Sequence, residues 1–322
     1  MGLPYATDHY RKAKKLDAIC TDAESQALQL KRKLWETVCA YDRYISVLFH
    51  LPPGTRGYFT SPLLPAMEDG TVCSMSYNYH LANICPKIYD LELSYLRDGP
   101  GVAVDSYEKV LGIDRDLRAL SALTPKIWWQ EYRTHSAPAK IVQFLHYYLL
   151  ARVHLRPAFM DDTNDQYAYS RTVCHEACTN AVTRFLDMRP SLPSGFFLAR
   201  IVDMQALTAA TCLLLSSHSP SREQELHDDL RTLHLVHQTI EAFKLISARE
   251  DSDTSFPQEA ITTLTAVHQL FAQNDPDQDY QTSLQMPLLG EICIRRPGCE
   301  PGSPVRDPAF WSFDVTFGRT WL

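Results

Sequence analysis

The sequence predicts an all-α fold: a large irregular helical bundle with long inter-helix loops and an irregular C-terminal tail. Glycine is sparse, with 12 in 322 residues, which favours long helices over turn-rich β architecture. Apolar residues recur at three- and four-residue spacing, and no segment shows a clear strand-like alternation. The pattern predicts a helical regulatory domain over 1–274 and an irregular, partly disordered tail over 275–322.

The first helix is expected to begin near Thr21 and to run to about His50. Thr21 and Glu24 have the spacing of a capping box. Pro52-Pro53-Gly54 ends the helix, because proline has no N–H and disfavours a helical residue before it. Apolar positions at three- and four-residue spacing predict one buried stripe, made of Leu30, Leu34, Val38, Tyr41, Ile45 and Leu48.

Further helices follow from apolar periodicity and from proline and glycine punctuation. Residues 51–75 predict a loop, and the helix after it is expected to be interrupted at Pro86. The segment 140–155, KIVQFLHYYLLARVHL, is apolar on nearly all sides, which predicts a central core helix. The expected helices are 77–97, 103–122, 136–157, 166–188, 196–216, 219–248 and 257–272.

Charge and cysteine content narrow the functional classes. The net charge of −7 disfavours a surface that grips nucleic acid, which is usually locally basic. Two basic clusters, 11–15 and 31–33, fit either a short nuclear-import patch or a solvated helix face. Nine scattered cysteines without a Cys-x-x-Cys pair predict reduced core thiols in a cytosolic or nuclear protein. The longest apolar run, near 206–215, is shorter than the ~20 residues of a membrane helix.

Two segments carry a family resemblance. RKLWETVCAYDRYISVLFHLPP, at 32–53, and VHLRPAFMDDTNDQYAYSRTVCHEACTNAV, at 153–182, resemble the fungal-specific transcription factor domain, the middle homology region of zinc-cluster regulators. Met1-Gly2-Leu3-Pro4 resembles a further element of that domain, and the likeness covers roughly 1–220. The matching positions are Arg32, Leu34, Trp35, Asp42, Arg43, Ser46, Pro52, Pro53, His154, Arg156, Pro157, Tyr169, Ser170, Arg171, Cys174 and Ala177.

The resemblance implies a nuclear transcriptional regulator that acts through its helical domain, and it suggests a secondary-metabolite gene cluster as the setting. Its partners would be other transcription regulators, itself or a small effector. The chain lacks the family's six-cysteine zinc cluster, so no direct DNA contact is expected from it. The short apolar runs predict no membrane contact. The signature residues are interpreted as scaffold: Trp35 as an apolar anchor, and Asp42 with Arg43 as a bonded ion pair at the core boundary. No catalytic or cofactor-binding residue is expected.

Two other interpretations stay open: a truncated gene model, and a secondary-metabolism enzyme on the same fold. Asp161, Asp162 and Asp165 have the Asp-Asp-x-x-Asp spacing with which terpene cyclases hold Mg²⁺, although aspartates also suit a loop that caps a helix. A metal-free cyclase that works by pocket shape is the other enzymatic form. A second metal candidate is one face of a predicted helix, which equally fits a solvated surface and carries His227, His234, His237 and Glu241.

Overall fold

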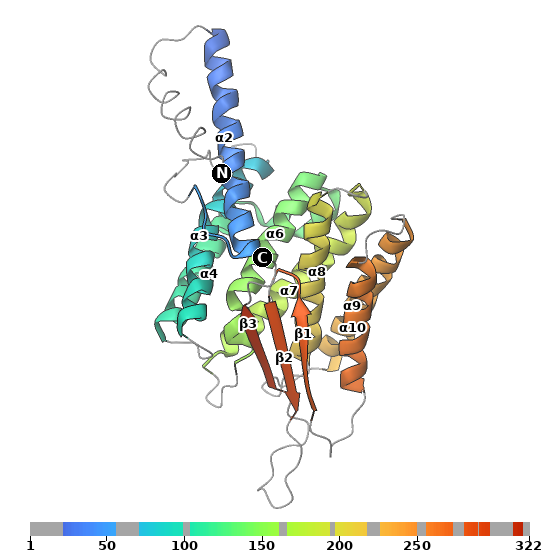
Figure 1. Cartoon of the computed structure of the whole chain (residues 1–322). Coiled ribbons are helices and arrows are strands. Elements are labelled where there is room, and N and C mark those ends of the chain that lie inside the picture. The colour runs from blue at the N-terminus through green and yellow to red at the C-terminus, as the bar shows by residue number, and fades with distance from the viewer. Residues whose placement is uncertain are drawn as a thin grey trace, which may run out of the picture. The chain divides into compact units, whose positions relative to one another are not determined.

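The computed structural model of the protein confirms the all-α class over the residues that it describes. They are 22–55, 71–98, 104–160, 166–193, 197–217, 226–249, 256–272, 280–288, 290–296 and 312–317. The helices are α2 (Asp22–Phe49), α3 (Ser74–Asp98), α4 (Val104–Ala122), α5 (Lys126–Gln130), α6 (Ala137–Ala158), α7 (Ala168–Met188), α8 (Phe197–Ser217), α9 (Leu226–Arg249) and α10 (Phe256–Ala272) (Figure 1). Two short 3-10 turns cover Tyr132–Thr134 and Arg189–Ser191.

The chain divides into two compact units. Unit 1 contains residues 1–90 and 116–125, and unit 2 contains residues 91–115 and 126–322. Helices α3 and α4 contribute residues to both units. The α3 helix continues through Pro86 without the interruption expected there.

Helix α2, in unit 1, buries a different face from the predicted one. Leu30 is 69% exposed, Leu34 is 64% exposed and Tyr41 is 56% exposed, and Val38 and Ile45 also count among the exposed side chains. Only Leu48 of the predicted stripe is buried. The buried face lies on the opposite side of the helix and consists of Trp35, Cys39, Ala40, Arg43, Ser46 and Val47. The expectation was wrong because α2 is apolar on two faces, and periodicity cannot say which of them packs.

The end of α2 lies where the sequence places it. His50 has a φ of 51°, the left-handed conformation typical of the residue after a helix. The Leu51 amide donates to the Ser46 carbonyl at 3.1 Å, the six-to-one bond of a Schellman motif. The Pro52-Pro53 pair follows directly, so two independent features end the helix.

Helix α6 is the central helix of unit 2, as the sequence predicts. It packs along α7, and nearly every residue from Val142 to Ala158 is buried. Its buried side chains include five with polar or charged groups, namely Gln143, His146, Arg152, His154 and Arg156. Helix α8 is long and apolar enough to cross a membrane, but 83% of its apolar window is buried inside the protein. Burial of that kind is the property of a core helix.

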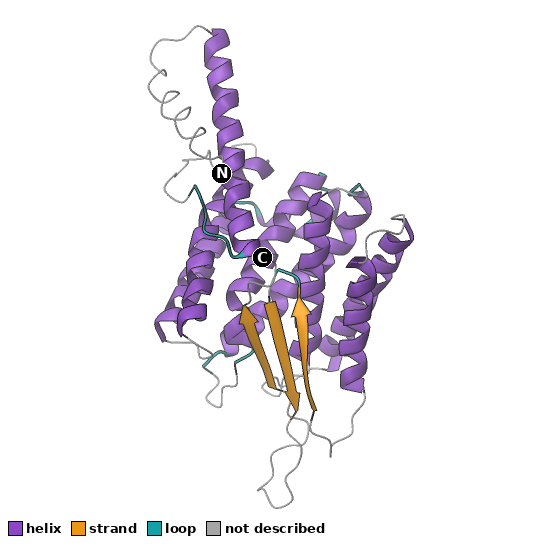
Figure 2. Cartoon of the chain, in the orientation of Figure 1, coloured by secondary structure: helices purple, strands orange, loops and turns teal. Residues whose placement is uncertain are grey.

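The C-terminal region departs from the expectation of an irregular tail. It contains three antiparallel strands in the order β1-β2-β3: β1 (Tyr280–Met286), β2 (Gly290–Arg296) and β3 (Ser312–Phe317) (Figure 2). On β2, Ile292 and Ile294 are fully buried, while Cys293 between them and Glu291 and Arg295 on either side are more exposed. This alternation is short, but it has the period of a strand with one buried face. The domain boundary expected at residue 274 stays a prediction.

Candidate functional site

Two residues of the first signature segment, Asp42 and Arg43, contact the turn that follows α2. The Asp42 carboxylate accepts hydrogen bonds from the Gly54 amide at 3.3 Å, the Thr55 amide at 2.8 Å and the Thr55 hydroxyl at 2.6 Å. Asp42 therefore holds the segment after Pro53, the buried one of the two prolines. A carboxylate that accepts two backbone amides makes charge-assisted bonds, which are stronger than neutral ones.

Arg43 bonds to different partners from Asp42. Its guanidinium donates to the Asn83 side-chain oxygen on α3 and, at 3.4 Å, to the Thr55 carbonyl. The ion pair expected between Asp42 and Arg43 is therefore replaced by two separate contacts, because neighbouring helical residues project about 100° apart. Together the two side chains hold the turn and α3 against α2.

The remaining signature residues of unit 1 have structural positions. Trp35 is buried, as an apolar anchor should be. The Ser46 hydroxyl donates to the Arg43 carbonyl at 2.7 Å, inside the helix. Arg32 makes a surface pair with Glu36 at 3.1 Å, and Leu34 is exposed.

The second signature segment forms a buried polar cluster in unit 2. His154 Nδ1, on α6, lies 3.0 Å from the Ser170 hydroxyl on α7. His154 Nε2 lies 3.3 Å from an Asp114 carboxylate oxygen on α4, and the Tyr169 hydroxyl donates to the other oxygen at 2.7 Å. Ser170 also donates to the Tyr107 hydroxyl at 3.4 Å. Three helices thus meet at one hydrogen-bonded group, of which Asp114 and Tyr107 lie outside the predicted signature.

The chemistry of this cluster is structural. Serine, histidine and aspartate are the residue types of a nucleophilic triad, but His154 and Ser170 are fully buried and Asp114 is 3% exposed. A nucleophile needs access to a substrate, whereas these side chains are enclosed, and the hydrogen bonds between them join the helices that carry them. The cluster therefore sets the register of α4, α6 and α7.

The other matching positions of the second signature segment lie on α6 and α7. Arg156 donates to the Tyr95 carbonyl at 3.4 Å and lies 4.7 Å from the centre of the Tyr95 ring, a cation–π contact. Pro157 lies inside the last turn of α6 rather than at its end. Cys174 is buried and its thiol lies 3.7 Å from the Ala151 carbonyl. Arg171 is part of the first turn of α7, where its amide donates to Tyr167.

Sequence reasoning missed a buried ion pair of unit 2. Arg152 Nε and Nη2 lie 2.5 and 3.2 Å from the two Glu92 oxygens, and both side chains are almost fully buried. The same guanidinium donates to the Tyr148 hydroxyl at 3.1 Å and to the Leu288 carbonyl at 2.8 Å. Burial alone lowers the pKa of Arg152, but Glu92 raises it above its ordinary value, so the side chain stays charged.

The Arg152 contacts reach the turn between β1 and β2. Besides Leu288, whose φ of 63° lies in the left-handed region, the Pro287 carbonyl accepts a bond from the Thr208 hydroxyl of α8 at 3.3 Å. Two helices thereby hold the tip of the hairpin. No sequence signal pointed to this, because Arg152 lies within an apolar run and its partners are distant in sequence.

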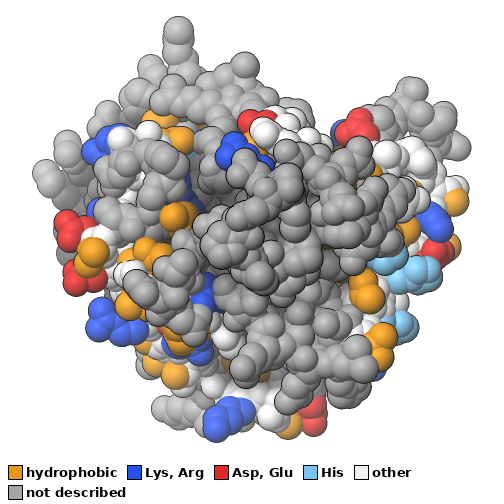
Figure 3. Space-filling model, turned by 90° about the horizontal axis from the view of Figure 1, so that it is seen from below, with side chains coloured by type: hydrophobic (Ala, Val, Ile, Leu, Met, Phe, Trp, Pro, Cys, Tyr) orange, Lys and Arg blue, Asp and Glu red, His pale blue; other side chains and the backbone are white. Residues whose placement is uncertain are grey.

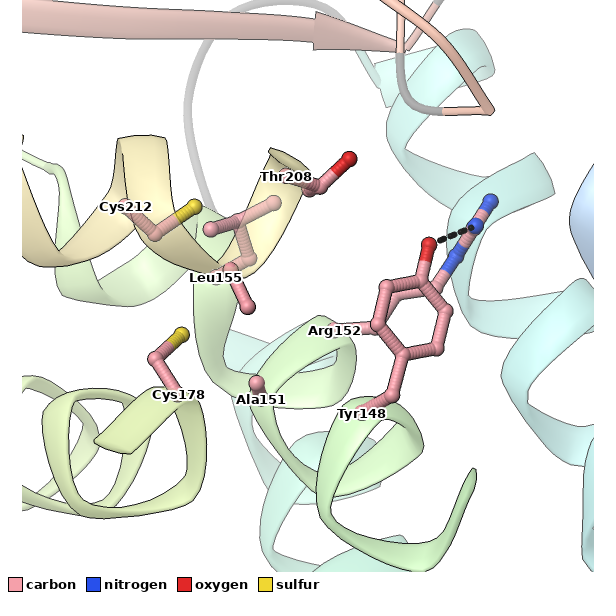
Figure 4. Close-up of a pocket in the computed structure, with 8 residues that line it drawn as sticks. Tyr148, Ala151, Arg152, Leu155, Cys178, Thr208 and Cys212 are labelled. Carbon is pink, nitrogen blue, oxygen red and sulfur yellow. Dashed lines mark hydrogen bonds between the residues drawn. The ribbon is translucent and has the colours of Figure 1, made fainter. Parts of the chain in front are cut away.

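A small pocket lies beside these contacts (Figure 4). It is lined by Tyr148 and Arg152 at one end and by the thiols of Cys178 and Cys212 at the other. The space holds roughly one water molecule, well below the several hundred Å³ of a typical ligand site. Hydrogen bonds to Cys174 and Cys212, together with burial, raise the pKa of Cys178 well above its ordinary value, so the thiol stays protonated.

The metal candidates have different outcomes. Asp161, Asp162 and Asp165 lie outside the described residues, as does the Met1–Pro4 element, so the Mg²⁺ hypothesis stays untested. His234 and His237 are exposed on α9, and Glu241 pairs with Lys244 at 2.9 Å. Figure 3 shows histidine side chains at one edge of the face seen from below. Among the residues with described side chains, no group of three or more metal-binding residues converges.

The protein is all-α, and most of the matching positions in the two signature segments, 32–53 and 153–182, belong to the cores of its two units. No family model matches the chain, and no solved structure matches it. The chain is 23% identical over 246 residues to "Transcription factor sdnS" from Sordaria araneosa. The similarity covers 70% of this chain but 30% of that protein, so the chain spans less than a third of its relative's length.

Proposed function

We propose that this chain is the helical regulatory part of a fungal transcriptional regulator. The similarity to a curated fungal transcription factor carries the proposal. The two signature segments support it, because their residues make specific buried contacts in the places where a scaffold needs them.

The proposed action is binding of other regulators rather than direct contact with DNA by this segment. A net charge of −7 supports this, since a surface for the phosphate backbone is usually basic. The pocket beside Arg152 has room for roughly one water molecule, so we do not assign a small effector to it. Nuclear localisation and a role in a secondary-metabolite gene cluster are further parts of the proposal, and they rest on the resemblance.

A reporter assay tests the proposal. The full chain is fused to an unrelated DNA-binding domain and expressed in a fungal host, with the binding site for that domain placed upstream of a reporter gene. We expect reporter transcription to change relative to the DNA-binding domain alone. Arg152→Met, which removes the buried pair with Glu92, is expected to abolish the effect, whereas Leu245→Lys on the exposed face of α9 is a matched surface control. A stable nuclear fusion that leaves the reporter unchanged contradicts the proposal.

A further inference from the structure

Helix α2 of unit 1 has an exposed face that is apolar. Five large apolar side chains of α2 are exposed, and we call them the α2 stripe: Leu30, Leu34, Val38, Tyr41 and Ile45. At about 100° per residue they fall within roughly 80° of the helix circumference. Their spacing of four, four, three and four residues is that of a ridge that packs against another helix. Scattered apolar residues are ordinary on a surface, but a contiguous row indicates an interaction site.

We propose that the α2 stripe packs against the α2 stripe of a second copy of this chain, with the two helices antiparallel. This deepens the proposed function, because it names a partner of the regulatory domain. The opposite face of α2 is buried within unit 1 through Trp35, Cys39 and Val47. The helix therefore has one face for its own core and a second apolar face that is free to pack on another helix.

Charge selects the antiparallel orientation. Lys31, Arg32 and Lys33 are exposed at the N-terminal end of the stripe. A parallel pair would bring these cations next to the same cations of the partner. An antiparallel pair instead separates the two sets of cations and brings each set near the partner's Asp42, which carries a negative charge.

The antiparallel pairing also offers a specific ion pair. A two-fold axis between Thr37 and Val38 places Leu34 opposite the second copy's Tyr41. Lys31 and Asp42 lie on the same side of the stripe, and with a rise of 1.5 Å per residue the pairing brings them to within about 3 Å of the same level along the helices. Asp42 accepts three hydrogen bonds within its own chain, and a carboxylate has about four acceptor positions. It can therefore accept one more from Lys31 of the second copy.

The size of the stripe sets the expected affinity. A stable interface uses roughly 800 Å² and 20 to 30 residues on each side. Five side chains and their flanking residues provide less, so the dimer is expected to form reversibly with a Kd in the micromolar range.

Sedimentation equilibrium of the purified full chain tests the interface. Between about 1 and 100 µM we expect a monomer–dimer equilibrium. Val38→Asp places two carboxylates beside the two-fold axis and is expected to raise the Kd at least tenfold. Leu245→Asp, at a 60% exposed position on α9, is the matched control and leaves the Kd unchanged. A parent chain that stays monomeric overturns the proposal, and so does a Val38→Asp chain that dimerises like the parent. If the parent is monomeric and Val38→Asp lowers its melting temperature, the stripe is covered by the chain's own residues.

Disulfide formation tests the orientation. A mixture of Leu34→Cys and Tyr41→Cys chains should form a mixed cross-linked dimer above the background set by the nine native cysteines. Leu34→Cys alone should stay at that background, and efficient self-cross-linking of this variant overturns the antiparallel pairing.

The reporter assay separates the two proposals. A chain that dimerises through α2 but has no effect on transcription contradicts the proposed function alone. A chain that changes transcription equally with and without Val38→Asp, and that stays monomeric, contradicts the dimer alone.

Discussion

The buried pair between Arg152 and Glu92 allows a quantitative prediction about unit 2. Arg152→Met keeps much of the side-chain volume but leaves the Glu92 carboxylate buried without its cation, since the two side chains are 1% and 2% exposed. Breaking such a pair costs about 3–5 kcal/mol. The Leu288 carbonyl loses a donor as well, which adds about 1 kcal/mol. The total approaches the whole stability of many domains, about 5–15 kcal/mol.

Urea unfolding followed by circular dichroism measures this loss. We expect a large fall in the unfolding midpoint for Arg152→Met. The double variant Arg152→Met/Glu92→Leu removes both charges and should recover most of the stability, because a buried pair contributes little over an apolar replacement. Lys87→Met is the exposed control: its pair with Asp116 has side chains 61% and 41% exposed, so it should cost less than about 1 kcal/mol. If Arg152→Met unfolds at the same urea concentration as Lys87→Met, the buried pair does not stabilise unit 2 more than an exposed pair does.

Three more predictions concern other parts of the chain. Asp42→Ala removes the bonds to Gly54 and Thr55 and should lower the stability of unit 1 by about 2 kcal/mol in urea unfolding, and a neutral result would mean that the turn holds without it. Cys178, buried and with a raised pKa, should react with iodoacetamide at neutral pH more slowly than the partly exposed Cys73, as peptide mass spectrometry can measure; equal rates would contradict its burial. Burial raises the pKa of Tyr44 and Tyr148. Phenols in the unfolded chain ionise near pH 10. The stability that the two buried tyrosines contribute is therefore complete below about pH 10 and is lost as the pH rises above it. Urea midpoints that do not fall between about pH 9 and pH 11 would show that these phenols ionise freely in the folded protein.

The helices were predictable because their signals are local. Pro52-Pro53-Gly54 marks the end of α2, and the all-round apolar segment at 140–155 marks the central helix. The strands were missed because the alternation around Ile292 and Ile294 is only a few residues long. The buried face of α2 was missed because both candidate faces have helical spacing, and only tertiary packing distinguishes them.

The polar contacts were less predictable because their partners are distant in sequence. His154 and Ser170 belong to one segment, and their proximity agrees with the resemblance. Asp114, which joins them, lies 55 residues from Tyr169 and carries no motif. Adjacency in sequence was equally uninformative for Asp42 and Arg43, which point in different directions from the helix.

The hydrogen bond between α6 and the β1–β2 turn has a consequence for the synthesis of the chain. Arg152 and Leu288 are 136 residues apart, and ribosomes add about 5–20 residues per second. Leu288 is therefore added on the order of ten seconds after Arg152. During translation, the helices of unit 2 are therefore made before the β1–β2 hairpin. Arg152 can donate to the Leu288 carbonyl only after that hairpin has been synthesised.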